Sequence, residues 1–460
     1  MSATNHQQFV FPDDSRYDDA RQAWNLAADL RPAVVVLPTS TADVVAAVNY
    51  AAERDLRIVV QGTGHGASVH APLDGTLLLN MRQLRGVEID VQNRRARVEA
   101  GVLWEEVVAP AAEHGLAALH GSSPNVGVVG YSLGGGIGWM ARMHGLSSES
   151  VLAVELVTAA GELVRADRTQ NTDLFWALRG GGGGLGVVVA MEIGLYPVEE
   201  LVAGMLIWPW ERSTDVLTRY VEWAENAPKT VSASARMLQI PPLPDIPEEL
   251  RGRQIVVIDG AVLGTEDEAN AILAPLRELG PEIDTFGTVP AASLVRLHMD
   301  PEPPMPGIGD GVMVDALDPA AIAAIVEVAG PGTDSPLVIV ELRQLGGALR
   351  RRMPGAGALG SLDGSFAFFA LGVPINPEVA QAVESRIDAL KQAIAPWSRG
   401  KPYLNFAERR VAIGDAIGAE AFARLEGIKA SVDPDGRFRS GHAFAPATVA
   451  DTDTDTAIAA

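Results

Sequence analysis

The chain has 460 residues, of which 47% are hydrophobic and 20% charged, so it can form a packed core and is not a disordered chain. Its formal net charge of −22 has the wrong sign for attracting nucleic acid or a membrane surface, and neither is expected as a partner. Cysteine is absent, which excludes disulfides, thiolate nucleophiles and cysteine metal sites. Residues 1–15 lack the features of a secretory signal, and no apolar run is long enough for a membrane span, so a cytoplasmic location is expected.

The first two hundred residues alternate short apolar runs with helical patterns. Strands are predicted at Ala33–Leu37, Arg57–Gln61, Thr76–Met81, Gly86–Asp90, Arg95–Ala100, Val151–Thr158 and Val187–Leu195. Helices are predicted at Val44–Glu53, Leu103–His114 and Thr172–Arg179. Ser40 is suited to cap the first of these helices, and Gly115 to end the second. This alternation is typical of an α/β or α+β nucleotide-binding domain.

Longer amphipathic helices and proline-rich loops follow Pro197, which indicates a second domain. Its predicted helices are Glu211–Glu225, Glu266–Leu279, Pro319–Ala329 and Pro377–Ile394, with strands at Gln254–Asp259 and Leu337–Leu342. Residues 404–444 are predicted to form a short strand, the helix Ala416–Ser431 and a turn. The tail Asp451–Ala460 is of low complexity, and we expect it to be disordered.

Three glycine clusters stand out in the first domain. They are Gly62–Gly66, the segment His120–Pro124 with the glycines that follow it up to Gly136, and Gly180–Gly186. Glycine lets backbone N–H groups approach an anionic ligand closely, so three such clusters favour a large phosphate-bearing cofactor over three isolated tight turns. The cofactor is not bound as in a Rossmann fold, because the first cluster lacks the third glycine of that motif. No P-loop motif is present.

A serine hydrolase is one alternative interpretation. Gly130–Gly134 matches the G-x-S-x-G motif with Ser132 as the nucleophile, and His442 could act as its base. The glycine-rich residues after Ser132 are a poor start for the helix that this motif requires. A metal site is not expected, because only His65 and His70 lie close together and no H-E-x-x-H motif occurs.

Taken in order, the motifs resemble the FAD-linked oxidases of the vanillyl-alcohol-oxidase superfamily, on the berberine-bridge-enzyme branch. The resemblance covers nearly the whole chain and rests on Arg31–Ala33, Pro38–Ser40, Gly64–His65, Gly121–Gly127, Leu133–Trp139, His144–Leu146, Asp173–Gly180, Leu185–Val188, Tyr403–Phe406, Phe422–Leu425, Asp433–Asp435 and Phe438–Arg439. It implies an α+β fold with a bipartite FAD-binding domain, residues 1–200 and 400–460. A substrate domain, residues 201–399, would be inserted between the two parts.

The resemblance also implies a covalent cofactor. The family usually attaches its flavin through the 8α-methyl group to the histidine of the first glycine turn, which is His65 here. Plant-type members add a second bond from a cysteine where this chain has Ser123, so a single bond through His65 is predicted. The arginine that the family places before the turn is Gln61 in this chain.

The resemblance assigns the remaining contacts of the cofactor mainly to the glycine turns, although the run from Gly134 to Gly138 could equally serve close packing of the backbone. The FAD-binding residues that it implies are Gly62, Thr63, Gly64, His65, Gly66, Gly121, Ser122, Ser123, Val126, Gly127, Gly130, Gly134, Gly138, Val188, Tyr403 and Asn405. Val126 would line the space in which O₂ reacts, and its small side chain favours an oxidase.

The catalytic residues are less clearly indicated. The family often uses the tyrosines of a Tyr-x-Asn-Tyr strand, of which this chain has Tyr403 but Phe406. Tyr403, Tyr131 and Glu341 are the candidates. Core packing is the alternative for the two tyrosines, and an ordinary charge at a strand end is the alternative for Glu341.

The resemblance implies oxidation of a small organic molecule, an alcohol, an amine or a secondary metabolite, by hydride transfer to flavin N5, with O₂ as acceptor and H₂O₂ as product. The strand Ser365–Leu371 carries three phenylalanines, which are expected in the core, although alternate ones could face a pocket and favour an apolar substrate. A non-catalytic flavin carrier is the other alternative, and the oligomeric state is not predicted.

Overall fold

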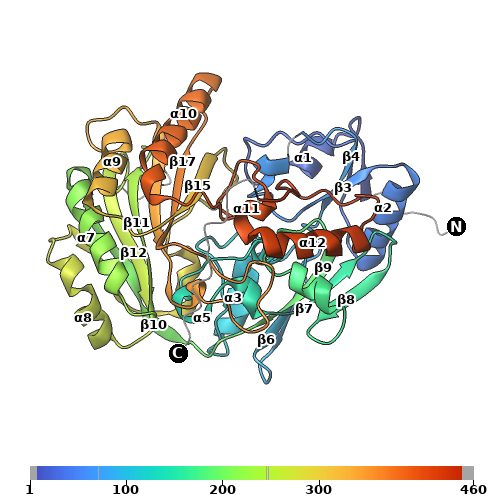
Figure 1. Ribbon diagram of the computed structural model, residues 1–460, viewed down its shortest axis with the longest axis horizontal. Coiled ribbons are helices and arrows are strands. Elements are labelled where there is room, and N and C mark those ends of the chain that lie inside the picture. Colours follow the sequence, from blue (N-terminus) through green and yellow to red (C-terminus); the bar gives the residue numbers. More distant parts are fainter. Residues whose placement is uncertain (1–7, 71, 245, 247, 448–460) are drawn as a thin grey trace.

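The computed structural model describes residues 8–70, 72–244, 246 and 248–447, so the predicted disordered tail lies outside the described residues. Strands form three sheets, and helices lie between and outside them (Figure 1). This mixture of helices and sheets confirms the predicted α+β fold class. The short 3₁₀ helices are η2 (Ala67–His70), η3 (Ser147–Ser150), η4 (Trp210–Arg212), η5 (Ala291–Arg296), η6 (Gly347–Arg350) and η7 (Ala395–Trp397).

The first sheet has the strand order β1-β2-β4-β3, and its three longer strands run parallel. The strands are β1 (Phe9–Val10), β2 (Val34–Val36), β3 (Arg57–Gln61) and β4 (Thr76–Asn80), and the helices of this region are α1 (Tyr17–Arg21) and α2 (Thr41–Glu53). Ser40 caps α2, because its side chain accepts a hydrogen bond from the backbone N–H of Asp43. The first glycine turn follows β3 directly, at the carboxyl end of the parallel strands, where open α/β sheets bind their ligands.

The second sheet is antiparallel and has the order β5-β6-β9-β7-β8. Its strands are β5 (Val87–Asp90), β6 (Arg95–Glu99), β7 (Val151–Val157), β8 (Leu163–Asp167) and β9 (Val187–Gly194). The helices α3 (Trp104–Ala112), α4 (Val128–Leu133), α5 (Ala141–His144) and α6 (Thr172–Ala177) lie in its connections. Gly115 follows α3 with a positive φ of 65°, as the sequence predicts for a helix stop.

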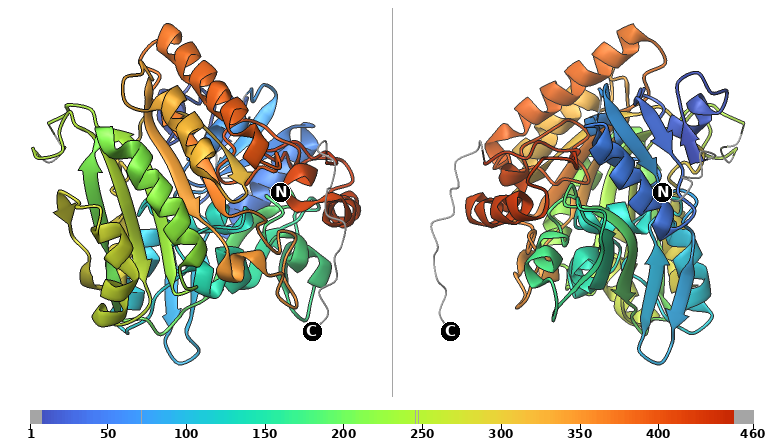
Figure 2. Two further views of the ribbon diagram at one scale, coloured as in Figure 1. Left: turned by 60° about the vertical axis from the view of Figure 1, so that its left-hand side comes forward. Right: turned by 90° about the vertical axis from the view of Figure 1, so that its right-hand side faces the viewer.

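The third sheet has eight strands and is antiparallel throughout. Its strands are β10 (Glu200–Pro209), β11 (Val231–Gln239), β12 (Gln254–Val262), β13 (Ile283–Asp284), β14 (Gly287–Pro290), β15 (Ile308–Val314), β16 (Leu337–Gln344) and β17 (Phe366–Gly372). The helices α7 (Ser213–Asn226), α8 (Glu266–Arg277), α9 (Pro319–Ala329) and α10 (Pro377–Ala393) cover one face of it, away from the first two sheets (Figures 1 and 2).

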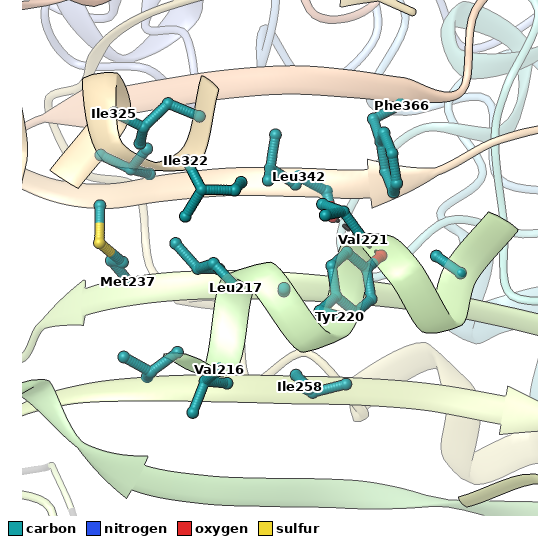
Figure 3. Packing of buried hydrophobic residues seen from close by; sticks show 14 of the residues in the cluster. Val216, Leu217, Tyr220, Val221, Met237, Ile258, Ile322, Ile325, Leu342 and Phe366 are labelled. Carbon is teal, nitrogen blue, oxygen red and sulfur yellow. Dashed lines mark hydrogen bonds between the residues drawn. The ribbon is translucent and has the colours of Figure 1, made fainter. Parts of the chain in front are cut away.

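The two faces of the third sheet differ in chemistry. Phe366 points toward the helices and packs in the same core as Tyr220 and Ile322 (Figure 3). Phe368 belongs to the same buried cluster. Their burial confirms the prediction that they belong to the core, and it removes them as evidence for an apolar pocket. Phe369 points the other way and contacts Phe406.

The chain returns to its first part after α10. Helices α11 (Ile413–Ile417) and α12 (Ala419–Val432) pack against the core of the second sheet. The N–H of Ile58 in β3 donates to the carbonyl of Arg437, and Phe438 joins the core of the first sheet. The short strand predicted in this segment is wrong, since Tyr403 begins a turn in which its carbonyl accepts from the N–H of Phe406.

Candidate functional site

The glycine clusters meet between the first two sheets and the third. A Cβ atom added at Gly134 would lie 1.8 Å from Asn405 Oδ1, and one at Gly138 would lie 1.9 Å from the carbonyl oxygen of His120. Glycine is therefore required at Gly138, because a side chain there would displace the His120 backbone, whereas a side chain at Gly134 would push aside the Asn405 amide. In the first turn, an added Cβ at Gly64 would meet Ala23 and Trp24, so the turn packs tightly against the segment before β2.

His65 sits in the first glycine turn with its ring held on two sides. The indole of Trp24 stacks on it at 4.2 Å, and the Thr63 hydroxyl oxygen lies 2.8 Å from Nδ1. The other ring nitrogen, Nε2, is buried and has no hydrogen-bond partner among the described residues. Burial lowers the pKa of His65 to about 4, although the Asn125 side chain and the Asp300 carboxylate act in the opposite direction. The imidazole is therefore neutral at pH 7 and has a lone pair available for bond formation.

Further buried polar atoms near this turn lack partners within the described part of the chain. They are Gln61 Oε1, Ser68 Oγ, His70 Nδ1, Ser440 Oγ and His442 Nδ1. The first lies in β3, the next two in η2 and the last two in the segment that follows α12. This last segment is in contact with η2, since a Cβ atom added at Gly441 would lie 3.1 Å from the His70 ring. Buried polar groups in proteins are normally hydrogen-bonded, so this cluster fits a ligand that carries many polar atoms. A dinucleotide cofactor such as FAD has this chemistry.

Tyr131 and Tyr403, the two predicted catalytic tyrosines, converge on the second glycine cluster. The N–H of Gly136 donates to the Tyr403 hydroxyl oxygen over 2.7 Å, and Asn405 Nδ2 donates to the carbonyl of Tyr131 over 3.0 Å. The Tyr131 hydroxyl is buried and has no partner within the described residues. Burial raises the pKa of both phenols, so each is protonated at neutral pH and can donate a hydrogen bond to a ligand.

Glu341 is not an ordinary charge at a strand end, because it lies buried inside β16. Its Oε1 accepts hydrogen bonds from the Ser234 hydroxyl over 2.8 Å and from Arg343 Nε over 2.6 Å. Burial raises the pKa of Glu341, but Arg343 and His298 outweigh it and hold that pKa well below its usual range. A carboxylate that Arg343 holds in its ionised form is a weak proton acceptor, which favours a role of Glu341 as an ion partner over the predicted role in catalysis.

Sequence reasoning missed the rest of this ionic cluster. His298 Nδ1 lies 2.7 Å from Asp259 Oδ2, which also accepts from Arg236 over 2.5 Å. Asp259 and Arg236 each stand inside an otherwise apolar or small-residue strand, and a charge in such a position was the available signal.

The remaining predicted cofactor residues line the same region. Ser122 donates to Asp300 over 2.8 Å, and Ser123 donates to Asn125 over 2.9 Å. Val126, which is partly exposed, and the buried Val188 belong to one apolar cluster with Tyr131. A Cβ atom added at Gly127 would lie 3.7 Å from the Thr63 methyl group, so the two residues are neighbours. A Cβ atom added at Gly130 or Gly66 would meet nothing within 4 Å. Gly62 is the residue that directly follows β3.

Comparison with known proteins identifies the ligand of this site. Residues 32–167 match the FAD binding domain family. The chain is 28% identical to (R)-6-hydroxynicotine oxidase of Paenarthrobacter nicotinovorans, over 95% of its own length and 96% of that protein. The chain therefore contains an FAD-binding domain and is homologous to FAD-linked oxidases. It also shares its fold with two solved structures.

One is 6-hydroxy-D-nicotine oxidase from Arthrobacter nicotinovorans, with a TM-score of 0.79, 25% identity and coverage of 94% of this chain and 96% of that chain. The other is BBE-like 1 of Physcomitrella patens, with a TM-score of 0.83, 22% identity and coverage of 95% and 96%. Both span nearly the whole length, so the predicted fold is confirmed.

The structure of the protein does not support the hydrolase alternative. Ser132 lies in the last turn of α4, fully buried, with its hydroxyl 3.1 Å from that of Ser147. His442 instead contacts the carbonyl of Leu404 through Nε2. Within the described ranges no group of three or more histidine and acidic residues is arranged for a metal ion. No helix among them is long and apolar enough to cross a membrane.

Proposed function

We propose that the protein is an oxidase of small organic molecules, with FAD attached to His65 and O₂ as the electron acceptor. Bound FAD supplies a two-electron acceptor that takes a hydride at N5 and passes the electrons to O₂, giving H₂O₂. Residues 1–200 and 400–460 would hold the cofactor, and residues 201–399 would cover it and bind the substrate. The homology to FAD-linked oxidases supports the chemistry.

The observation that carries the covalent attachment is the state of His65. Its ring is fixed by Trp24 and Thr63, it is neutral at pH 7, and its buried Nε2 has no partner among the described residues. When Nδ1 carries the ring proton and donates it to the Thr63 hydroxyl oxygen, Nε2 has the lone pair that a bond to the 8α-carbon requires. That carbon would lose a proton, and the two electrons would pass to the flavin and from it to O₂. Ser123 occupies the position of the second attachment in plant-type members, so a single bond is proposed.

The proposed roles of the other residues follow from their contacts. Backbone N–H groups of the first two glycine clusters would bind the phosphates and the flavin edge. The protonated phenols of Tyr131 and Tyr403 would donate hydrogen bonds to the substrate or to the flavin. Val126, small and partly exposed, would leave space for O₂.

An absorption spectrum before and after acid precipitation tests the cofactor and its bond. Flavin bands that remain with the precipitated protein support the proposal, whereas bands that stay in the supernatant contradict the covalent bond. H₂O₂ release is then measured on a panel of alcohols, amines and oligosaccharides. Flavin that no member of a broad panel reduces would favour a carrier over an enzyme.

A further inference from the structure

A small cavity lies where the third sheet faces the second glycine cluster. Gly138 and Trp139 line it on the glycine side, and Ser232 and Arg343 line it on the sheet side. Its walls contain no aspartate or glutamate. A Cβ atom added at Gly138 would lie 3.6 Å from the Tyr131 hydroxyl oxygen. Since Tyr131 is part of the proposed flavin site, the cavity adjoins that site.

Arg343 is held in this wall by contacts that leave part of its guanidinium free. Its Nε donates to Glu341, and its Nη2 lies 3.2 Å from His298 Nε2. The rings of Trp139 and Phe406 flank it at 5.8 and 5.2 Å. Its Nη1 has no hydrogen-bond partner in the part of the chain that the structure describes.

The side chains around the cavity favour a ligand that accepts hydrogen bonds. A guanidinium and an indole N–H can only donate hydrogen bonds, and the Trp139 N–H is buried without a partner among the described residues. A ligand oxygen with negative charge in the cavity would accept from the guanidinium. Such charge-assisted hydrogen bonds are about twice as strong as neutral ones.

An ionic cluster behind Arg343 holds it in place. Burial and Arg236 lower the pKa of His298, but the carboxylates of Asp259 and Asp300 outweigh them and raise that pKa. When His298 is protonated, three cations, the buried Arg236 and His298 and the partly exposed Arg343, face the carboxylates of Asp259, Glu341 and Asp300. Asp300 lies at the edge of the cluster, is partly exposed and accepts from Ser122.

We propose that Arg343 binds a negatively charged oxygen of the substrate, a carboxylate or a phenolate, next to the flavin. This inference rests on the proposed function and names the substrate class for that site. It contrasts with the apolar substrate that the phenylalanine-rich strand suggested, since two of those phenylalanines face the helices.

Titration of the flavin-loaded protein with benzoate and with its neutral isostere benzamide tests the proposal. The readouts are the change in flavin absorbance and calorimetric affinity, neither of which depends on turnover. We expect wild type to bind benzoate at least about tenfold more tightly than benzamide. Arg343→Gln should weaken benzoate about 10- to 100-fold and leave benzamide unchanged. Arg351→Gln, the same substitution at an exposed position, should change neither affinity.

Arg343→Lys keeps the charge and serves if the glutamine variant fails to fold; it should weaken benzoate several-fold only. Equal affinities of wild type for the two probes, or unchanged benzoate affinity in Arg343→Gln, would overturn the inference. An altered flavin reduction potential with unchanged benzoate affinity would place Arg343 against the flavin instead. A protein without flavin contradicts the proposed function, whereas a yellow protein that does not discriminate contradicts the binding role of Arg343.

Discussion

At the scale of single residues, His65 combines restraint with reactivity. Stacking on Trp24 fixes the plane of the imidazole, and contact with Thr63 leaves Nε2 as the nitrogen without a partner among the described residues. A histidine on an open surface would have neither the fixed plane nor the lowered pKa, so the setting of His65 is specific to this turn.

We expect His65→Ala to fold and to bind FAD without a covalent bond. In the proposed site the pyrophosphate contacts would come from backbone groups of the turn, which an alanine does not remove. After acid precipitation the flavin of the variant should stay in the supernatant, as measured by its absorbance. His114→Ala, at an exposed position after α3, is the control and should behave like wild type. Retention of flavin by the His65 variant would point to another attachment residue.

Glu408 is a second residue whose surroundings set its charge. Its Oε2 accepts from the N–H of Gly309 over 2.9 Å. Burial raises the pKa of Glu408 to about 7. The hydrogen bond from Gly309 lowers this pKa, and the nearby Asp310 carboxylate raises it. A carboxyl group with a raised pKa contributes stability that is present below its unfolded pKa and is lost as the pH rises toward 7.

Glu408→Gln removes this titration and retains an acceptor for Gly309. We expect the variant to gain stability relative to wild type between about pH 5 and pH 8, by about 1 to 3 kcal/mol at the upper end. Thermal melts followed by circular dichroism at both ends of that range measure the difference. A difference between the two proteins that does not change with pH would show that Glu408 is ionised throughout.

The residues of the site were predictable from the sequence to very different degrees. The motif around His65 and the glycines could be recognised, because their spacing along the chain is itself the signal. The cluster of Arg343, His298 and Asp259 could not, since it assembles from three separate elements. Alternation along β11 places Arg236 and Ser234 on one face, but it does not say which strands pair with it.

At the scale of elements, glycine has opposite effects in different places. A Cβ at Gly138 would lie 1.9 Å from a backbone oxygen, which cannot move without displacing the second cluster. Gly427 lies inside helix α12, and a Cβ there meets nothing within 4 Å. The first glycine is therefore required by its neighbours, whereas the second only weakens its helix.

We expect Gly138→Ala to reduce the flavin content of the purified protein strongly, because it pushes the segment at Gly138 away from the His120 backbone at the start of the second cluster. Gly427→Ala should raise the free energy of unfolding by about 0.5 to 1 kcal/mol and leave the flavin content unchanged. The ratio of flavin to protein absorbance and a denaturant titration measure the two effects. Normal flavin content in Gly138→Ala would show that the cluster can relax.

Where apolar residues recur at a regular helical or strand spacing, the bounds of the element were predicted to within a few residues, as for β3, α9 and α10. The segment from Tyr403 was predicted as a strand and is a turn. Its residues have strand propensity, but the Tyr403 hydroxyl binds Gly136 and Asn405 binds Tyr131, and these distant contacts decide the local conformation.

At the scale of the whole molecule, the proposed cofactor site draws on distant parts of the chain. A ligand that contacts β3, the second glycine cluster and the segment after α12 binds only to the folded protein and not to the unfolded chain. FAD should therefore raise the free energy of unfolding of the His65→Ala protein by about 2.7 kcal/mol at a hundred times its Kd, and its melting temperature should rise with FAD concentration. Riboflavin, which lacks the phosphates, should give a smaller shift in the same assay. A melting temperature independent of FAD would exclude binding at this site.

The pairing of Ile58 with Arg437 has a consequence for synthesis of the protein. A ribosome that adds about 5 to 20 residues per second needs roughly 20 to 75 seconds to travel from the first of these residues to the second. During that interval the edge of β3 and the apolar side chains beside it are exposed to solvent. Nascent chains that expose such groups tend to aggregate or to bind chaperones. The proposed cofactor pocket includes His442 and cannot be complete until that residue has left the ribosome, so we expect loading of FAD to be one of the last events in the maturation of this chain.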